Sequence, residues 1–470
     1  MPFTGREIAE ATGGDLIRGN VDQVFSDVST DTREPLAGKL FIPLQGPRFD
    51  GHSFLPAAVS AGAAGLLVRE GEEGHLKEIR SDITVVRVRD TLTALGEIAG
   101  FWRRKFDLPV VAITGSAGKT TTKEMAAQML AGSKQILKTE GNFNNLIGLP
   151  LTLLRLRPVH EVAILEMGTN VPGEIGRLSR IAAPDLGLIT NIGPAHLEGL
   201  KSVALVKEEK GELFRLLSRQ GTAVVNVDDD AVRELAARRS GRQITYGLKR
   251  AAEVAAEEVV HSARGLSFVL RIGDKRGKVA MAAPGNHNLM NALAAAALGR
   301  ALGVDPDVIR RGLQAFRPIP GRMEITQLKN GAFLINDAYN ANPVSVREAL
   351  LTLRNLRGGR RGTVILGDML ELGEGAGAWH EEIGGLLAAT GVDRIFLLGT
   401  FARQTAKGAE EKGVPPARIE FPATPEEIAE RLAPILQAGD WLLVKGSRAM
   451  KMEEVVKCIT ETFGKAPEGA

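Results

Sequence analysis

A glycine-rich turn at residues 115–121 holds the side chains best suited to chemistry. Its residues are Gly115, Ser116, Ala117, Gly118, Lys119, Thr120 and Thr121. Glycines let backbone N–H groups turn toward an anion, the lysine reaches outer phosphates, and the following threonine can bind Mg²⁺. The turn follows an apolar run, although Ile113 stands where the usual pattern has glycine. This phosphate-binding loop predicts a nucleoside triphosphate as ligand.

Two further polar side chains follow later apolar runs. Glu166 ends the run at 162–166, and His196 follows the run at 185–192. If these runs are neighbouring parallel strands, their carboxyl ends meet at the edge of the sheet that carries the loop. Glu166 and His196 would then complete a Mg²⁺ site with Thr120, the imidazole directly or through a water. Taken alone, Glu166 also fits an exposed strand end, and a loop histidine is more often structural.

The elements that must position these residues form three regions of an α/β chain. Short β-like runs and alanine-rich segments predict a small α/β domain over residues 1–88. A helix at 92–106 and the strands around the loop predict a central doubly wound parallel sheet over residues 89–320. After residue 320 the rhythm restarts and predicts a Rossmann-like α/β domain over residues 321–470. The strands expected in that domain lie at 333–337, 363–368, 394–399 and 441–445.

Composition sets the outer limits. The 470 residues, 44% of them hydrophobic, exceed what one core holds, so two or three domains are expected. A net charge of +3 and few aromatic residues argue against nucleic acid as a partner. The single cysteine, Cys458, excludes an internal disulfide. Because no apolar signal segment or spanning run occurs, we expect a soluble, cytoplasmic protein without membrane insertion.

Several residues near and beyond the central region suit nucleotide binding less specifically. Asn286 or Asn288 is expected to cap the alanine-rich helix that follows Gly285. Arg322 could clamp a phosphate, and Asp337 at a strand end could accept hydrogen bonds from a ribose. Taken singly, each also fits an ordinary turn residue.

The order of these motifs resembles the Mur ligase family, the ATP-dependent enzymes that build the peptide stem of bacterial cell-wall precursors. The resemblance covers nearly the whole chain. It rests on 114–121, Glu166 to Gly168, 190–192 with His196, His287 and Asn288 with Asn291, Gly321 and Arg322, and Asp337. It implies an ATP-dependent ligase of peptidoglycan synthesis.

Four segments resemble the member of the family that acts last in the series. They are residues 141–150, 337–343, 367–373 and 445–448. The resemblance implies that UDP-N-acetylmuramoyl-tripeptide and the dipeptide D-Ala-D-Ala are the substrates. ATP would phosphorylate the tripeptide carboxylate, and the dipeptide amine would attack the resulting acyl phosphate. Val344 stands where the preceding ligase has an arginine, which favours a dipeptide acceptor.

The family also implies two Mg²⁺ ions and a carbamylated lysine among their ligands. The lysine maps best onto Lys210, although Lys207 is close. The implied metal set is Thr120, Glu166, His196 and Lys210, and Lys119 would act on the migrating phosphoryl group. From the residues alone, this Lys/Glu stretch reads as a solvated helix face.

Nucleotide and substrate contacts carry over from the resemblance residue by residue. The implied nucleotide contacts beyond the loop are Asn291 with adenine, Arg322 with phosphate and Asp337 with ribose. Ser29, Thr30 and Arg33 resemble the segment that holds the UDP end. The other implied substrate contacts are Asn142, Asn144, Asn145, Asn340, Lys445 and Ser447.

Two other functions stay open at this point. A folate polyglutamate ligase of the same superfamily would share the ATP apparatus but should lack the roughly one hundred residues before the loop. A P-loop switch or transport ATPase should carry guanine-reading or arginine-finger elements in place of a third α/β domain.

Overall fold

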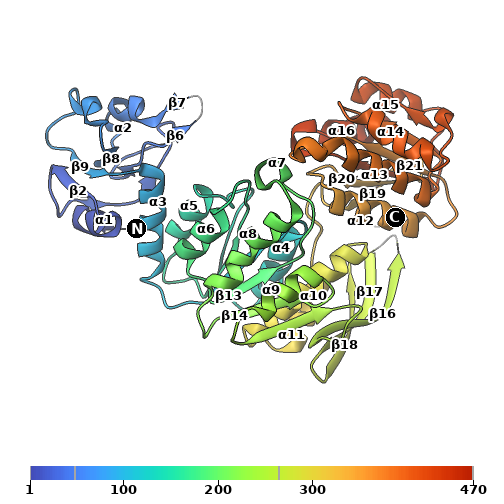
Figure 1. Ribbon diagram of the computed structural model, residues 1–470, viewed down its shortest axis with the longest axis horizontal. Helices are drawn as coiled ribbons and strands as arrows, with labels where there is room; N and C mark the ends of the chain where they lie inside the picture. The colour runs from blue at the N-terminus through green and yellow to red at the C-terminus, as the bar shows by residue number, and fades with distance from the viewer. Residues whose placement is uncertain (1, 47–48, 263–264, 468–470) are drawn as a thin grey trace. The chain divides into compact units, whose positions relative to one another are not determined.

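The computed structural model describes residues 2–46, 49–262 and 265–467, which form two compact units (Figure 1). Unit 1 comprises residues 1–112, 134–168 and 174–185, and unit 2 comprises residues 113–133, 169–173 and 186–470. The division passes through strand β10 (Val110–Thr114). The three predicted regions, 1–88, 89–320 and 321–470, stay a prediction.

Unit 1 begins with a five-stranded mixed sheet in the order β2-β9-β8-β5-β4. β2 pairs with β9 in antiparallel fashion and the other pairs are parallel. The sheet strands are β2 (Asp15–Arg18), β4 (Val28–Ser29), β5 (Leu40–Phe41), β8 (Gly65–Arg69) and β9 (Thr84–Val88). Phe41, Leu66 and Val85 lie in its buried core, so this part of the chain forms an α/β layer of its own.

The remaining elements of unit 1 include helices that pack on one another. α3 (Thr91–Arg103) contacts α1 (Gly5–Thr12), α5 (Gly148–Leu154) and α6 (Glu174–Ala182). β11 (Ile136–Lys138) and β12 (Val162–Glu166) pair in parallel, and β12 is buried throughout. The smaller elements are β1 (Phe3–Thr4), β3 (Val24–Phe25), β6 (Gln45–Gly46), β7 (Phe49–Asp50) and α2 (Leu55–Ser60).

The first part of unit 2 contains a parallel set of strands extended by an antiparallel ribbon. β13, β14, β15 and β16 pair in parallel, whereas β16, β17 and β18 pair in antiparallel fashion. The strands are β13 (Leu186–Ile189), β14 (Thr222–Asn226), β15 (Gln243–Gly247), β16 (Val254–Ser262), β17 (Gly265–Ile272) and β18 (Lys275–Met281). The helices are α4 (Lys119–Ala131), α7 (Leu197–Leu200), α8 (Val203–Leu216), α9 (Asp230–Ala237), α10 (Asn286–Ala301) and α11 (Pro306–Gln314).

The second part of unit 2 is a six-stranded sheet in the order β19-β20-β24-β21-β22-β23. Only the β19–β20 pair is antiparallel among these pairs. The strands are β19 (Glu324–Gln327), β20 (Phe333–Asp337), β21 (Gly362–Leu366), β22 (Arg394–Leu397), β23 (Ile419–Glu420) and β24 (Trp441–Lys445). The helices are α12 (Pro343–Arg357), α13 (Ala376–Thr390), α14 (Ala402–Glu411), α15 (Pro425–Leu432) and α16 (Glu453–Phe463).

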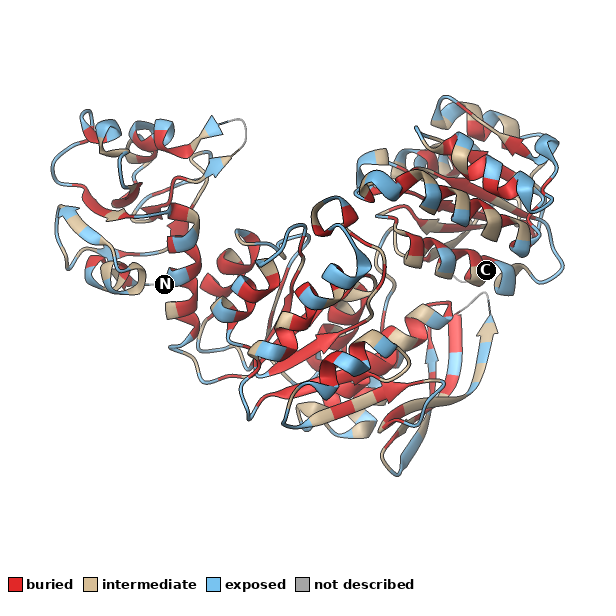
Figure 2. Cartoon of the chain, viewed as in Figure 1, coloured by how far each residue is buried: buried red, intermediate tan, exposed pale blue. Residues whose placement is uncertain are grey.

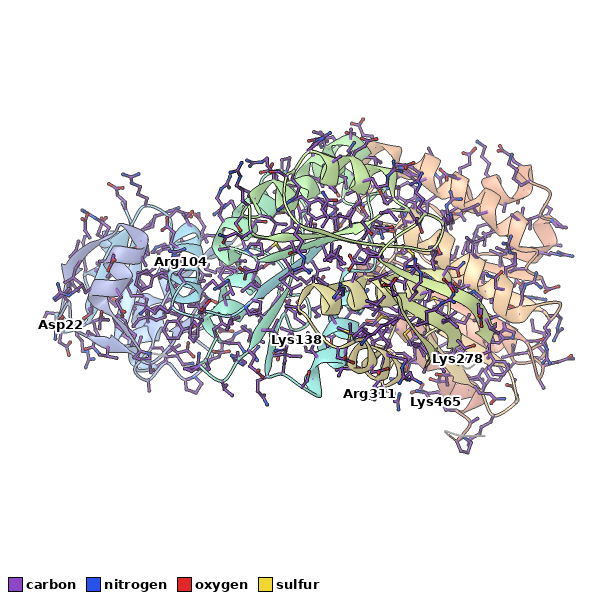
Figure 3. All side chains as sticks on the ribbon, turned by 90° about the horizontal axis from the view of Figure 1, so that it is seen from below. Asp22, Arg104, Lys138, Lys278, Arg311 and Lys465 are labelled. Atoms are coloured by element: carbon purple, nitrogen blue, oxygen red, sulfur yellow. The ribbon has the colours of Figure 1, made fainter. Side chains whose placement is uncertain are left out.

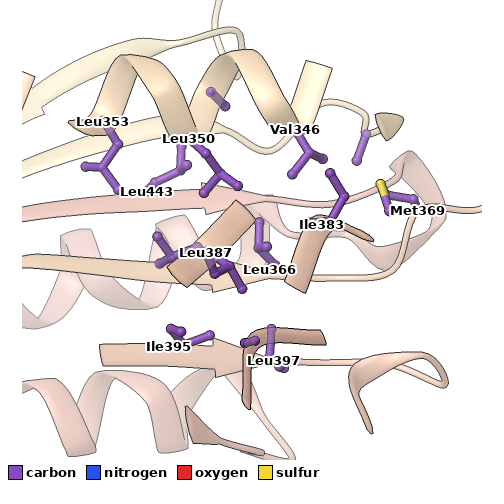
Figure 4. Packing of buried hydrophobic residues seen from close by; sticks show 14 of the residues in the cluster. Val346, Leu350, Leu353, Leu366, Met369, Ile383, Leu387, Ile395, Leu397 and Leu443 are labelled. Atoms are coloured by element: carbon purple, nitrogen blue, oxygen red, sulfur yellow. The ribbon is translucent and has the colours of Figure 1, made fainter. Parts of the chain in front are cut away.

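Alternating side chains of this sheet enter two separate cores. Leu443 and Ile395 pack in a cluster with Val346 and Leu350 of α12 and Ile383 of α13 (Figure 4). The neighbouring strand residues Leu442 and Phe396 pack in a second cluster, with residues of α15 and α16. A parallel sheet covered by helices on both faces is the doubly wound arrangement predicted for this region.

Burial follows the same logic in the rest of the chain. β10, β12, β13 and β14 are buried at every position, as is typical of parallel strands covered on both faces (Figure 2). Charged side chains lie on the outside, among them Lys278 of β18 and Arg311 of α11 (Figure 3). Within the described residues, no helix combines the length and apolar character that crossing a membrane requires.

The α/β class and the parallel sheets are confirmed. The antiparallel ribbon β16 to β18 was not predicted. The strand predicted at 185–192 was too long, since β13 ends at Ile189. The residues after Ile189 hydrogen-bond to the glycine loop instead, which shortens the strand.

Candidate active site

The phosphate-binding loop lies between β10 and α4, as its sequence predicts. Gly115 has φ 146° and Gly118 has φ 83°, both in the region that favours glycine. A Cβ on Gly115 would lie 1.9 Å from Thr190 Oγ1, and one on Gly118 would lie 2.4 Å from Asn291 Oδ1. Both glycines are therefore required by conformation and by close packing.

The segment after β13 holds the loop in place. Thr190 N–H donates to the carbonyl of Thr114 at 2.9 Å, and Ser116 N–H donates to that of Asn191 at 3.0 Å. Ala117 N–H donates to Asn191 Oδ1 at 2.9 Å. These bonds fix the loop directly ahead of α4, whose N-terminus is the kind of site that suits an anion.

Lys119 begins α4 and folds back over the loop. Its Nζ donates to the carbonyl of Gly115 at 2.8 Å. Its charge lowers the pKa of Lys210 and that of Glu371, so both side chains lie within electrostatic reach of Lys119. Lys119 and Lys210, predicted from distant parts of the sequence, are thus brought together.

Lys210 lies on α8 and is fully buried. Within the described part of the chain, its Nζ has no hydrogen-bond partner. Burial lowers its pKa well below the ordinary value, and the charge of Lys119 adds to this, while Glu209 acts in the opposite direction. A lysine in this position is held toward its neutral, nucleophilic form.

Lys207 lies one turn earlier on α8 in a different environment. Its ammonium pairs with Glu234 of α9, and 19% of its side chain is exposed. The two candidate lysines therefore differ in burial and in their partners.

His196 follows β13 and takes a left-handed backbone conformation with φ 54°. Its Nδ1 lies 2.7 Å from Glu371 Oε2 in the segment after β21. The hydrogen bond to His196 is the main influence that lowers the pKa of Glu371, despite partial burial. Glu371 was not among the residues predicted for the site.

Glu166 lies in unit 1 at the end of β12, and its carboxylate is almost fully buried. Oε1 accepts a hydrogen bond from Asn144 Nδ2 at 2.8 Å. Oε2 is buried and, within the described residues, has no hydrogen-bond partner. An unpartnered buried carboxylate oxygen is suited to a cation ligand.

The neighbouring asparagines differ in role. Asn145 Oδ1 accepts from the N–H groups of Ile147 and Gly148 ahead of α5, at 3.1 and 2.8 Å. Asn142 is exposed. Of these three asparagines, Asn144 is the one whose side chain donates a hydrogen bond to Glu166.

Residues from the second part of unit 2 reach the glycine loop. Arg322 donates to Thr120 Oγ1 at 3.1 Å, and its guanidinium lies 4.1 Å from the centre of the Tyr339 ring. Asn342 Nδ2 donates to the carbonyl of Ser116 at 3.1 Å. Arg322 is therefore placed beside the loop, and Tyr339 and Asn342 are additional contacts that sequence reasoning missed.

Asp337 and Lys445 end the adjacent strands β20 and β24 and form a buried pair. Lys445 Nζ lies 2.5 Å from Asp337 Oδ2 and also donates to the carbonyl of Asn340 at 2.8 Å. Ser447 is buried, and its hydroxyl accepts from Leu370 N–H at 2.8 Å. These residues hold their own loops together as well as lining one edge of the sheet.

The N-terminus of α10 differs from the prediction. Gly285, with φ 92°, is the N-cap, and neither Asn286 nor Asn288 caps the helix with its side chain. Asn288 Nδ2 instead donates to the carbonyl of Pro284 at 2.8 Å. Glycine suits this cap position because its φ is positive and because a Cβ there would meet Thr352 and His287. Asn291 bonds with Thr122 Oγ1 at 3.2 Å behind the loop.

The predicted UDP segment lies in unit 1. Ser29 is buried with its hydroxyl bonded to the Asp31 backbone, and Thr30 follows β4. Arg33 is largely exposed and bonds to Asp31 through two nitrogens. Its guanidinium holds the pKa of Asp31 at about 2.

No group of three or more His, Cys, Asp or Glu side chains that could hold a metal occurs in the described residues. The predicted metal set is of a different kind, since two of its four members are a threonine and a lysine. In unit 1, Glu166 Oε2 is buried and has no hydrogen-bond partner among the described residues, and in unit 2 the ring of His196 is oriented by Glu371.

Two parts of the chain match known sequence families. Residues 113–299 match the Mur ligase middle domain, and residues 321–448 match the family described as Mur ligase, glutamate ligase domain. The chain belongs to the Mur ligase family.

Two relatives of the chain in that family share one name. The chain is 36% identical to UDP-N-acetylmuramoyl-tripeptide--D-alanyl-D-alanine ligase of Bacillus subtilis (strain 168), covering 98% of both chains. It is also 36% identical to the ligase of the same name from Escherichia coli (strain K12), covering 95% of this chain and 97% of that one.

Solved structures give the same result. MurF from Acinetobacter baumannii superposes with a TM-score of 0.88 at 32% identity, covering 98% of this chain and 99% of that chain. MurF ligase from Thermotoga maritima, solved in complex with ADP, has a TM-score of 0.83 at 28% identity and covers 93% and 97%. The resemblance inferred from motifs is confirmed over nearly the full length.

Proposed function

We propose that this chain is the ATP-dependent ligase that joins D-Ala-D-Ala to UDP-N-acetylmuramoyl-tripeptide and so makes the pentapeptide precursor of peptidoglycan. The observation that carries the proposal is the full-length similarity to relatives named for this reaction. The loop, Lys119 and Lys210 supply chemistry that suits it.

The reaction would pass through an acyl phosphate. The terminal carboxylate of the tripeptide attacks the γ-phosphorus of ATP, and ADP leaves. The amine of D-Ala-D-Ala then attacks the acyl carbon and loses a proton, an amide bond forms, and the bond from the acyl carbon to the bridging oxygen breaks, so that phosphate leaves with that oxygen. Lys119 would offset the charge on the migrating phosphoryl group, because its ammonium begins α4 directly at the loop.

Further nucleotide contacts are proposed for residues near the loop. Arg322, already bonded to Thr120, would bind phosphate oxygens, and Asn291 would bind adenine. Asp337 would bind the ribose, which requires it to share its carboxylate with Lys445. Thr121 and the other loop residues, Gly115, Ser116, Ala117 and Gly118, would surround the phosphates.

Mg²⁺, two ions by resemblance, would be held by Thr120, Glu166, His196 and Lys210. When bound, the ions would neutralise charge on the ATP phosphates. Glu166 is suited to this by its unpartnered buried oxygen, and His196 by its oriented ring.

Lys210 rather than Lys207 would be the carbamylated lysine. A neutral amine attacks CO₂, a C–N bond forms, and one proton leaves, so that an anionic carbamate replaces a cation. Burial and the charge of Lys119 favour the neutral amine at Lys210, whereas the ammonium of Lys207 is engaged by the carboxylate of Glu234. Addition of ¹³C-labelled bicarbonate should give a carbamate NMR signal that persists in Lys207→Gln and is absent in Lys210→Met.

Substrate contacts are proposed by resemblance for two further groups of residues. Ser29, Thr30 and Arg33 would hold the UDP end. The tripeptide and dipeptide would contact Asn142, Asn144, Asn145, Asn340, Lys445 and Ser447. We also propose the cytoplasm as the site of action.

The test is ATP-dependent phosphate release with Mg²⁺, the tripeptide substrate and D-Ala-D-Ala, and then with each omitted in turn. Release only with both substrates, together with a pentapeptide product by mass, is the expected result. Release that needs neither substrate would point to a P-loop ATPase. Release with another acceptor, such as glutamate with a folate, would point to another ligase of the superfamily.

A further inference from the structure

His196 and Glu371 lie 175 positions apart in the chain, yet they meet through both side chain and backbone within unit 2. Besides the 2.7 Å contact between Nδ1 and Oε2, the N–H of Glu198 donates to the carbonyl of Glu371 at 3.0 Å. His196 has φ 54° and Glu371 has φ 63°. Side chains other than glycine rarely adopt this conformation, so the surrounding contacts must maintain both residues in it.

The segment 367–373 that carries Glu371 is anchored on its far side. Met369 N–H donates to His380 Nε2 at 2.9 Å, and His380 Nδ1 donates to the carbonyl of Ala376 at 2.7 Å. Leu370 N–H donates to the hydroxyl of Ser447 at 2.8 Å. The backbone on the N-terminal side of Glu371 is thus fixed by side chains from α13 and from the loop after β24.

Apolar packing fixes the same segment on its near side. Met369 and Leu372 lie on either side of Leu370 and Glu371. They belong to one buried cluster with Leu197 and Leu200 of α7. α7 directly follows His196. The segment and the histidine are therefore held together by a shared core as well as by the Nδ1–Oε2 hydrogen bond.

The direction of the contact matters for the chemistry of the ring. A carboxylate at Nδ1 accepts that nitrogen's proton, so the Nε2 lone pair is left to face a cation or its bound water. Histidines that bind metals almost always have such a partner on the other ring nitrogen, which fixes tautomer and ring orientation.

We propose that Glu371 is a positioning residue for the metal site: it fixes His196 in the tautomer that presents Nε2 and ties that orientation to the anchored segment 367–373. The proposal rests on the proposed function, in which His196 is a metal ligand. It differs from a purely structural role because it concerns the state of the ring and not only the stability of the fold.

The first test observes the ring without metal or substrates. Protein labelled with ¹⁵N-histidine would be measured by NMR above the pH at which the ring titrates, and the His196 signals would be assigned by their loss in His196→Ala. We expect the Nδ1–H tautomer in the wild-type protein and a mixture of tautomers in Glu371→Ala. The matched control is Glu374→Ala, three residues away and exposed. A wild-type tautomer that is unchanged in Glu371→Ala would overturn the proposal.

The second test measures metal affinity. Binding of Mn²⁺ to the protein, followed by its EPR signal, should weaken by about 10- to 100-fold in Glu371→Gln and remain unchanged in Glu374→Gln. Glu371→Asp keeps the charge on a shorter side chain and should recover part of the affinity, which also shows that loss of affinity does not come from misfolding. Equal affinity in wild type and Glu371→Gln would overturn the proposal.

These measurements remain informative if the proposed reaction is wrong. Failure of phosphate release with the named substrates, combined with the expected tautomer change, would reject the substrates and keep the role of Glu371. Normal phosphate release with no change of tautomer would keep the substrates and reject the role of Glu371.

Discussion

Burial is what distinguishes otherwise similar residues in the site. Lys207 and Lys210 share a helix and an acidic neighbourhood, but Lys210 is fully buried with its pKa lowered well below the ordinary value, whereas Lys207 is partly exposed and paired with Glu234. In the same way Glu166 differs from an ordinary strand-end carboxylate because one of its oxygens is buried without a partner in the described chain. Residue type alone would not have separated these cases.

Lys119→Ala should abolish phosphate release and leave the fold intact. The ammonium lies at the loop and would contact charge that develops on the phosphoryl group, so we expect a loss of at least about 100-fold in kcat. Steady-state phosphate release and the melting temperature are the measurements. Lys134→Ala, at a surface position, serves as the control. Normal turnover in Lys119→Ala would reject the assignment of the loop.

At the level of elements, strand ends and helix starts carry the site, and their geometry depends on a few glycines. Gly118 links β10 to α4 by a left-handed conformation and packs against Asn291. Gly285 also starts its helix, α10, with a positive φ, in a different region of backbone conformation. The position of Lys119 therefore depends on the backbone conformation of Gly118, and the position of Asn291 depends on that of Gly285.

Gly118→Ala should weaken nucleotide binding and lower stability. An added Cβ would lie 2.4 Å from Asn291 Oδ1 at a positive φ, which costs about 1–2 kcal/mol from conformation alone. Calorimetric titration with an ATP analogue and urea unfolding would measure both effects. Gly132→Ala, near the end of the same helix with φ −73° and open space around it, should change neither by more than a few tenths of a kcal/mol.

The start of α10 gives the chain a specific sensitivity to acid. Burial lowers the pKa of His287 from 6.5 to about 4, although the charge of Asp337 opposes this. Between these values the unfolded chain binds a proton that the folded chain does not, so stability should fall as the pH falls from about 6.5 to about 4. We expect a loss of about 1–3 kcal/mol, toward the lower end because the side chain is only partly buried.

Urea unfolding at pH 7.5 and pH 4.5 would test this, with His287→Gln as the comparison. The variant lacks the titrating ring and should lose less stability over the same interval. An equal loss in both proteins would assign the acid sensitivity to other groups.

The sequence predicted those elements of the site whose hydrophobic pattern is local. It did not predict the contacts between residues that lie far apart in the chain. β12, β20 and β24 were placed to the residue because short apolar runs end in a polar side chain. The β16 to β18 ribbon was missed, since its half-exposed strands alternate weakly with polar residues. Glu371 was missed because no local sequence pattern predicts its contact with His196, which lies 175 positions earlier.

For the whole molecule, the location of the site predicts how ligand binding should affect unfolding. The loop, Lys210, His196, Glu371 and Arg322 all belong to unit 2. A nucleotide that binds them should stabilise unit 2 by mass action, by about 2.7 kcal/mol at a free concentration one hundred times its dissociation constant. Stability should therefore rise unevenly along the chain.

Hydrogen exchange with and without an ATP analogue would measure this. Amides of α4, α8 and β13 should gain protection, and amides of the sheet β2-β9-β8-β5-β4 in unit 1 should gain little. In Lys119→Ala the gain should shrink at the same analogue concentration. Equal gains in both units would mean that nucleotide contacts extend well beyond the residues proposed.

The antiparallel ribbon has a consequence for behaviour at high concentration. β18 is the outermost strand of its sheet and offers unpaired backbone groups to any second chain that approaches along it. Lys278 stands exposed on that strand beside Lys275 and Arg276, which pair with Asp305 and Glu257, so two copies that meet edge to edge bring basic side chains together. We expect repulsion between these side chains to disfavour edge-to-edge pairing, and added salt to weaken the repulsion by screening.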